Sequence, residues 1–409
     1  MISVDEARAR ILSTVQPLPA DMVALPAALG RVLAEPVRAR VTQPPWPVAA
    51  MDGYAVRAAD ITTPPATLTR IGEAAAGGAF AGCVASGMAV RIFTGAPLPE
   101  GADTVVMQED TCVSGDGGDG STVTVQVSLP EGRHVRVQGQ DFTAGAIGLD
   151  AGRIVTARDI GVAAAMNVPW LMVHRRPRVA ILATGDEVVM PGDPLGPNQI
   201  LSSNGLALVA LVTALGGEAL NLGIAPDDHE ALAGRMATAA GADLLVTTGG
   251  ASVGERDLVR AVLIEQGGHL DFWKIAMRPG KPLMFGYTGA VPLLGLPGNP
   301  VSSQICALLF LKPLLRVLQG LPADEPPVPL ARLAVPLPAN DARQEYLRAS
   351  LSVDDSGNWR VTPFSHQDSA LTALLARADA LVVRPPHAPP AVAGALVPVL
   401  PLTGGCFSV

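Results

Sequence analysis

The chain has 409 residues and a formal net charge of −8, and 49% of its residues are hydrophobic. This length predicts two to four domains, and the apolar content is ample for sizeable cores. The acidic balance argues against a general nucleic-acid-binding protein, which should be basic. The four cysteines lie far apart, without a CxxC pair, so they indicate neither a zinc ribbon nor a disulfide framework. They are Cys83, Cys112, Cys306 and Cys406.

The sequence also argues against a membrane protein. No stretch reaches the roughly 18 uncharged apolar residues that span a bilayer. The most apolar one, 305–318, is interrupted by a lysine, a proline and an arginine. The first predicted helix carries charges and begins with Ser3 and Glu6, spaced as a capping box, so it does not resemble a signal peptide. We therefore expect a cytoplasmic protein.

The first part of the chain predicts a helical domain with a β domain inserted into it. Residues 1–40 are predicted to be helical, including the apolar segment 28–34. Short alternating runs separated by glycine and proline then predict a barrel-like β domain over 41–142. A further helix is predicted within 143–175, which would rejoin the first segment as a helical linker domain.

Strands alternate with helices over 176–325, which predicts a parallel α/β sheet domain that binds the ligand. Ligands of such sheets bind beyond the carboxyl ends of the strands. A proline-rich stretch, 321–340, is predicted to be a linker. The last part, 326–409, consists of short strands and predicts a second small β domain of the barrel type. The predicted fold class is therefore multidomain α/β plus β.

Polar loops follow the predicted strands of the sheet domain, and all of them should lie at one edge. Each loop also has a purely structural interpretation. Thr184–Glu187 could be only a turn, Asp227 could cap the next helix with Glu230 completing a capping box, and Asn299 could be a helix cap with Pro300 at the first helical position. Their convergence favours a binding site. The loops are Thr184–Glu187, Asp227–Asp228, Thr248–Gly254 with Asp257, Arg278–Lys281 and Pro297–Ser302.

The composition of these loops suits an anionic ligand and a divalent cation. Glycines and helix N-termini present backbone N–H groups to anions, and Arg278 and Lys281 add positive charge. Carboxylates are hard oxygen ligands for Mg²⁺. The candidates are Asp186, Glu187, Asp228 and Asp257. GxxxxGK[ST] does not occur, and no GxGxxG lies in the predicted sheet domain, which argues against an ordinary ATPase or a dinucleotide-binding enzyme.

Lysine is rare in this chain. Of 29 cationic residues, only Lys274, Lys281 and Lys312 are lysines. A lysine used against this bias suggests that a compact, mobile ammonium is required. In the C-terminal part, Arg343, Glu345 and Arg348 form a further charged cluster, and residues 365–369 form a polar loop.

Several motifs together resemble the molybdopterin molybdenumtransferase family, which includes the C-terminal part of gephyrin. They occur in the family's order over the whole chain. They are MDGYA (51–55), RIFTGAPLPEGADTVVMQE (91–109), TGDE (184–187), TTGGASVGERD (247–257), FWKIAMRPGKP (272–282) and LPGNPVS (296–302). The resemblance implies four domains and a homodimer with its site between subunits. It also implies transfer of molybdate onto adenylylated molybdopterin with Mg²⁺ and release of AMP.

The resemblance also assigns site residues. The catalytic set is Asp52, Thr94, Asp141, Glu187, Asp228, Asp257, Lys274 and Arg278, of which Glu187, Asp228 and Asp257 would hold the metal. The binding set is Thr184, Gly185, Asp186, Gly249, Gly250, Ser252, Gly254, Lys281, Pro297, Gly298, Asn299, Pro300, Ser302, Arg348 and Ser369. Two positions depart from the family. Arg278 stands where lysine is frequent, and Asp368 stands where glycine is expected beside the oxyanion pocket.

Other interpretations stay open at this point. The protein could insert tungstate, or it could be a pterin carrier or scaffold without turnover. A molybdopterin adenylyltransferase and molybdoenzyme acceptors are further expected partners. The presence of all five carboxylates of the catalytic set favours an enzyme. They are Asp52, Asp141, Glu187, Asp228 and Asp257.

Overall fold

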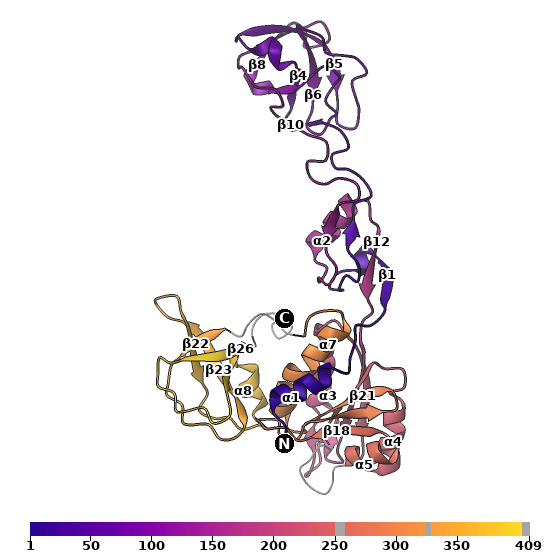
Figure 1. Ribbon diagram of the computed structural model, residues 1–409, viewed down its shortest axis with the longest axis vertical. Coiled ribbons are helices and arrows are strands. Elements are labelled where there is room, and N and C mark those ends of the chain that lie inside the picture. Colours follow the sequence, from indigo (N-terminus) through magenta and orange to yellow (C-terminus); the bar gives the residue numbers. More distant parts are fainter. Residues whose placement is uncertain (250–257, 324–328, 403–409) are drawn as a thin grey trace. The chain divides into compact units, whose positions relative to one another are not determined.

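The computed structural model describes residues 1–249, 258–323 and 329–402. These residues form two compact units (Figure 1). One comprises Met1–Asp21, Gly30–Ala34 and Val173 onward, and the other comprises Met22–Leu29 and Glu35–Met172.

The first unit is built on a six-stranded sheet. The order is β16 (Glu218–Ala225), β13 (Arg178–Thr184), β17 (Leu244–Thr248), β21 (Val291–Leu296), β20 (Met284–Thr288) and β18 (His269–Trp273). The first four strands are mutually parallel. The prediction of a parallel sheet is wrong for β20, which is antiparallel to both of its neighbours. Only Gly289 and Ala290 separate β20 from β21, and a two-residue connection forms a hairpin.

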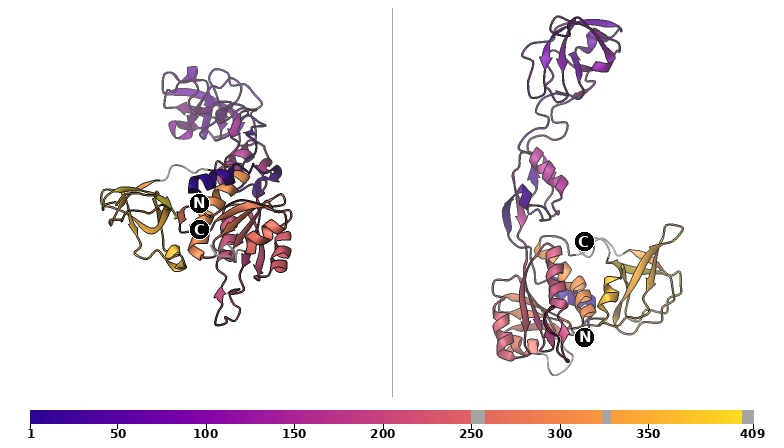
Figure 2. Two further views of the ribbon diagram at one scale, coloured as in Figure 1. Left: turned by 60° about the horizontal axis from the view of Figure 1, so that its bottom comes forward. Right: turned by 180° about the vertical axis from the view of Figure 1, so that it is seen from behind.

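Helices cover both faces of this sheet (Figures 1 and 2). Along β13, Val179 and Ile181 face one core and Ala180 and Leu182 face the other, because successive strand residues point to opposite faces. The first core also includes residues of α1 (Val4–Leu12), of α3 (Asn204–Ala214) and of the long helix Pro300–Leu318. The second takes up α4 (His229–Ala237) and α5 (Leu258–Glu265).

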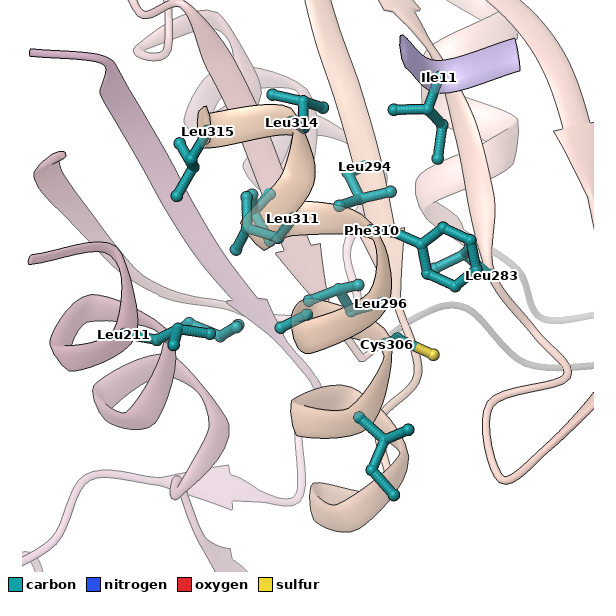
Figure 3. Packing of buried hydrophobic residues seen from close by; sticks show 14 of the residues in the cluster. Ile11, Leu211, Leu283, Leu294, Leu296, Cys306, Phe310, Leu311, Leu314 and Leu315 are labelled. Carbon is teal, nitrogen blue, oxygen red and sulfur yellow. The ribbon is translucent and has the colours of Figure 1, made fainter. Parts of the chain in front are cut away.

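The most apolar helix, Pro300–Leu318, lies in the core of this unit. It consists of α6 (Pro300–Cys306), a π-helical turn, η4 (Ala307–Leu311), and α7 (Lys312–Leu318). Pro313 lacks an N–H group, which accounts for the π turn directly before it. With a mean hydropathy of 1.5, the helix is long and apolar enough to cross a membrane, but 67% of it is buried within the protein. Figure 3 shows Phe310, Leu311 and Leu314 among the residues of this core.

A closed β-barrel follows, as predicted. Its strands are β22 (Leu330–Leu333), β23 (Gln344–Val353), β24 (Trp359–Pro363), β25 (Ala380–Arg384) and β26 (Leu396–Pro401). Pairing of β23 with both β24 and β25 closes the barrel. The prediction of a linker over 321–340 is therefore wrong in part, since β22 belongs to the barrel. A short helix, α8 (Thr372–Ala376), and a two-residue strand, β19 (Met277–Arg278), border it.

The second unit contains another six-stranded sheet. Its order is β7 (Thr104–Met107), β4 (Gly53–Val56), β6 (Met88–Ile92), β5 (Ala66–Ala74), β9 (Thr122–Val125) and β8 (Thr111–Ser114). The glycine-rich residues 115–121 connect β8 to β9 as a hairpin. Short pairs join β2 (Val37–Arg38) to β11 (Ile147–Leu149) and β3 (Val48–Ala49) to β10 (Val135–Arg136). The predicted helix after this domain is α2 (Ala157–Ala165), with Thr156 and Asp159 as a capping box.

The prediction of helix over residues 1–40 is wrong beyond α1. The stretch contains short strands, β1 (Ala20–Ala24) among them, and a 3-10 turn, η1 (Leu25–Ala27). Residues 28–34 form no α-helix, and Gly30 has a φ of +73°. Four prolines between residues 17 and 36 remove backbone donors, which opposes a continuous helix despite the apolar spacing.

Candidate functional site

The strands of the α/β sheet end together at one edge, as predicted. The parallel register places Thr184 opposite Ala225 and places Thr248 opposite Ala183 and Leu296. The antiparallel pairings bring the start of β20 and the end of β18 to this same edge. The predicted polar loops therefore begin side by side.

A cavity of about 890 Å³ opens at this edge. The predicted residues that line it are Thr184, Glu187, Gly249, Lys281, Pro297, Gly298, Asn299, Pro300 and Ser302. The rest of the lining comes from the segment 200–204, after β14 (Val188–Val189), from Ala183, Val188, Thr248 and Pro282, and from Ala370 and Thr372 beside the C-terminal barrel. The cavity therefore lies between the sheet and the C-terminal barrel.

Gly249 lets two loops of the cavity approach each other closely. Its φ is +89°, and an added Cβ would lie 2.4 Å from the carbonyl oxygen of Thr184. Gly298 packs against Gly249, since a Cβ added at Gly298 would lie 3.5 Å from the Gly249 Cα. Side chains other than hydrogen at Gly249 would be strained and would clash with backbone, so the requirement for glycine here is structural.

Asn204 connects three of the loops and was missed by the sequence analysis. Its Nδ2 donates to the Thr248 hydroxyl at 3.0 Å and to the Gly298 carbonyl at 2.7 Å. Thr248 in turn reaches the Pro297 carbonyl at 3.3 Å and the Ser303 hydroxyl at 3.4 Å. Because a carbonyl only accepts, the amide nitrogen must face Gly298. The sequence signal that could have revealed Asn204 is the polar Ser-Ser-Asn stretch at the start of an apolar helix.

Asn299 occupies the N-cap position of α6, but its side chain makes no capping hydrogen bond. Its Nδ2 instead donates to the Ser369 hydroxyl of the barrel at 2.9 Å. The Val301 N–H donates to the Ser369 carbonyl at 3.1 Å. The predicted cap is thus a contact between sheet domain and barrel. It leaves the helix N-terminus, which favours anions, beside the cavity wall formed by Ser302.

Carboxylates collect at the other side of this edge. The Asp186 carboxylate accepts the Asp227 N–H at 2.9 Å. The pKa of Asp227 is raised by partial burial and then by the charges of Asp186 and Glu187. Asp228, and not Asp227, caps α4, by accepting a backbone N–H at 2.8 Å. Within the described ranges, no three metal-ligating side chains lie close enough to form a metal site by themselves. Mg²⁺ commonly uses one or two carboxylates and completes its shell with phosphate and water, which fits this donor set.

Comparison with known families matches almost the whole chain. Residues 2–167 match the MoeA N-terminal region (domain I and II), residues 180–317 match a probable molybdopterin binding domain, and residues 330–402 match the MoeA C-terminal region (domain IV). A molybdopterin molybdenumtransferase of Haemophilus influenzae is 33% identical over 386 residues, which cover 94% of each chain. One from Nostoc sp. is 38% identical over 375 residues, covering 89% of this chain and 85% of the relative.

The chain belongs to the molybdopterin molybdenumtransferase family.

A solved structure supports the same relationship. A molybdopterin biosynthesis MoeA protein from Pyrococcus horikosii superposes with a TM-score of 0.85 at 30% identity, covering 99% of this chain and all of the solved one. The predicted fold class, multidomain α/β plus β, is therefore confirmed.

The cations that the family resemblance assigns do not all face the cavity. The Lys274 ammonium lies 3.6 Å from the centroid of the Trp273 ring. The Arg278 guanidinium lies 2.5 Å from a Glu345 carboxylate oxygen and 3.5 Å from one of Asp341. Of the assigned cations within the described part of the chain, Lys281 alone borders the cavity.

Arg348 is buried in the barrel, with 1% of its surface exposed. It donates to the backbone carbonyls of Asp368 at 2.8 Å and Leu371 at 3.1 Å and to the Gln367 side chain at 3.3 Å. Burial lowers the pKa of this guanidinium, and the charge of Asp368 opposes the shift. Arg348 thus supports the loop that carries Ser369. The Asp368 carboxylate accepts the Ala370 N–H at 2.8 Å, and the nearby guanidinium offsets its charge.

In the second unit, Asp52 and Thr94 form one exposed cluster. The Asp52 carboxylate accepts the Thr94 N–H at 2.7 Å and the Thr94 hydroxyl at 2.8 Å. These two bonds, with a smaller contribution from Arg91, lower the pKa of Asp52 and keep it ionised. Asp141 is exposed, and its backbone N–H donates to the Gln43 carbonyl at 3.0 Å.

The remaining predicted site residues are Gly185, whose φ is +137°, and four that lie outside the described residues. Those four are Gly250, Ser252, Gly254 and Asp257.

Proposed function

We propose that this protein inserts molybdenum into molybdopterin. The observation that carries the proposal is the cavity at the carboxyl edge of the sheet, where Lys281, Ser302 and the Pro297–Pro300 turn meet. Membership in the molybdopterin molybdenumtransferase family supports it. A lysine, a buried serine and a helix N-terminus together favour a small oxyanion.

In finer detail, we propose adenylylated molybdopterin and molybdate as substrates, and AMP and the molybdenum cofactor as products. The loops of Gly249 and Gly298 approach the phosphates without side chains in the way. Lys281 and Ser302 hold the molybdate. Glu187 and Asp228 would hold Mg²⁺, and the ion would supply Lewis-acid activation for cleavage of the phosphoanhydride by water or by a molybdate oxygen. No covalent nucleophile is required.

The test is AMP release by the purified protein from adenylylated molybdopterin, measured with molybdate, with tungstate and without an oxyanion. We expect release that depends on both molybdate and Mg²⁺. Binding of the pterin without release of AMP would instead favour a carrier or scaffold. A stronger response to tungstate would reassign the oxyanion.

We further propose a cytoplasmic homodimer. The family resemblance implies that Asp52, Thr94 and Asp141 of one chain complete the site of its partner. Light scattering at micromolar concentration should give about twice 41.9 kDa. A strict monomer that turns over would exclude the shared site. A molybdopterin adenylyltransferase as supplier and molybdoenzymes as acceptors follow from the chemistry of substrate and product.

A further inference from the structure

Arg278 is engaged by the C-terminal barrel. Its Nη2 lies 2.5 Å from Glu345 Oε1, and its Nη1 lies 3.5 Å from Asp341 Oδ2. Arg343 donates to the same Asp341 oxygen from Nη2 at 2.8 Å, and its backbone N–H donates to the other oxygen at 2.8 Å. Two guanidinium groups thus balance two carboxylates. Glu345 is the most enclosed member, with 16% of its side chain exposed.

The backbone around Arg278 is held from two sides. β19 pairs with β23 in parallel, with Arg278 opposite Glu345, and the Gln344 N–H donates to the Ala276 carbonyl at 2.9 Å. On the other side, the Ala276 N–H donates to the Ile2 carbonyl at 2.8 Å. The segment between β18 and β20 is therefore hydrogen-bonded both to the C-terminal barrel and to the residues before α1.

The same segment carries Lys281 into the cavity. The Ile275 N–H donates to the Lys281 carbonyl at 3.0 Å and closes the loop. Gly280 rests on the core helix, since an added Cβ would lie 2.5 Å from the Cys306 sulfur. Lys281 lines the cavity, whereas Arg278 does not. A displacement of Arg278 would thus reach the cavity through a short, closed loop.

We propose that Arg278 and Glu345, supported by Asp341, are positioning residues that fix the loop of Lys281 against the C-terminal barrel and so set the reach of the Lys281 ammonium into the cavity. This proposal rests on the proposed oxyanion-binding role of Lys281. Under this proposal, Arg278 acts without direct contact with the substrate. The charged residues Arg343 and Glu345 would then serve to hold the loop of Lys281.

The experiment compares Arg278→Gln, Glu345→Gln and the double variant. The first readout is hydrogen exchange of the amides of 274–283, and the second is the dependence of AMP release on molybdate. Glu218→Gln is the control, because Glu218 forms a more exposed ion pair with Arg178, at 3.4 Å, at the opposite end of the sheet.

Each single variant should accelerate exchange in the loop. Each should raise the molybdate concentration for half-maximal release by roughly 2- to 10-fold, which corresponds to the weaker part of the range of coupling energies for interacting pairs. Any change in the maximal rate should be the same in the two single variants. The double variant should be no worse than the worse single one, and the charge-reversed pair Arg278→Glu with Glu345→Arg should recover part of the loss. The control should change neither readout.

Additive losses in the double variant would overturn the proposal. So would a large fall in maximal rate for Arg278→Gln with Glu345→Gln unchanged, because Arg278 would then act on the substrate itself. If wild type shows no molybdate-dependent release, the proposed function fails, while the exchange data still decide whether the two residues fix the loop.

Discussion

The Asn204 amide provides the most decisive test of the cavity architecture. It donates two hydrogen bonds and joins the start of α3 to the end of β17 and to the turn at Gly298. Asn204→Asp is nearly isosteric, but it replaces the donor with a carboxylate oxygen. That oxygen would lie 2.7 Å from the Gly298 carbonyl oxygen, and two acceptors at this distance repel each other.

The magnitude follows from the bonds that are lost. Asn204→Ala removes two hydrogen bonds of about 0.5–1.5 kcal/mol each, so the free energy of unfolding should fall by about 1–3 kcal/mol. For a unit of this size, each 1 kcal/mol lowers the melting temperature by roughly 2–4 °C. At pH 7, Asn204→Asp should lower the free energy of unfolding by about 1 kcal/mol more than Asn204→Ala does, because it adds a repulsion between two oxygen atoms. A protonated carboxyl donates again, so this excess should shrink on acidification.

The assay is thermal unfolding of wild type and both variants at pH 7 and pH 4.5, with the molybdate dependence of AMP release measured beside it. Asn221→Asp is the matched control, because the Asn221 side chain accepts a hydrogen bond from the Gly223 N–H, and aspartate accepts equally well. The reasoning is refuted if Asn204→Asp melts at or above the temperature of Asn204→Ala at pH 7, or if the control loses as much as Asn204→Asp.

Three further predictions concern charges at the same edge. Lys281→Met should weaken the dependence on molybdate by roughly 10- to 150-fold, the equivalent of one charge-assisted hydrogen bond, with unchanged melting; an unchanged dependence would exclude Lys281 as a molybdate ligand. Asp228→Asn should keep the helix cap and the melting temperature, since asparagine caps equally well, yet should require more Mg²⁺ for AMP release; an unaltered Mg²⁺ titration would make Asp228 a cap alone. Asp227→Asn should raise the melting temperature at pH 7, with a gain that diminishes toward pH 4. The pKa of Asp227 is raised by burial and by Asp186 and Glu187, so its ionised form destabilises the fold above that pKa; an equal gain at both pH values would contradict this.

The positions of the polar loops could be predicted from the sequence because they depend on local order along the chain. A buried apolar run followed by Thr184–Glu187, and another followed by Pro297–Pro300, places both loops at the carboxyl edge of any sheet that pairs the strands in parallel. The second β domain could be predicted in the same way, since alternation and turn residues are local signals. The motifs that carry the family resemblance are likewise contiguous stretches.

Tertiary structure decided which partner each polar group has. Asn299 has the sequence context of a helix cap, but the Ser369 hydroxyl, 70 residues away, lies within 2.9 Å of its amide. Arg348 is a cation by sequence, but burial beside three acceptors makes it a support for a loop. Asn204 had no motif to reveal it. A hydrogen bond depends on distances of about 3 Å and on angles between groups, and for groups far apart in sequence only the folded chain determines these quantities.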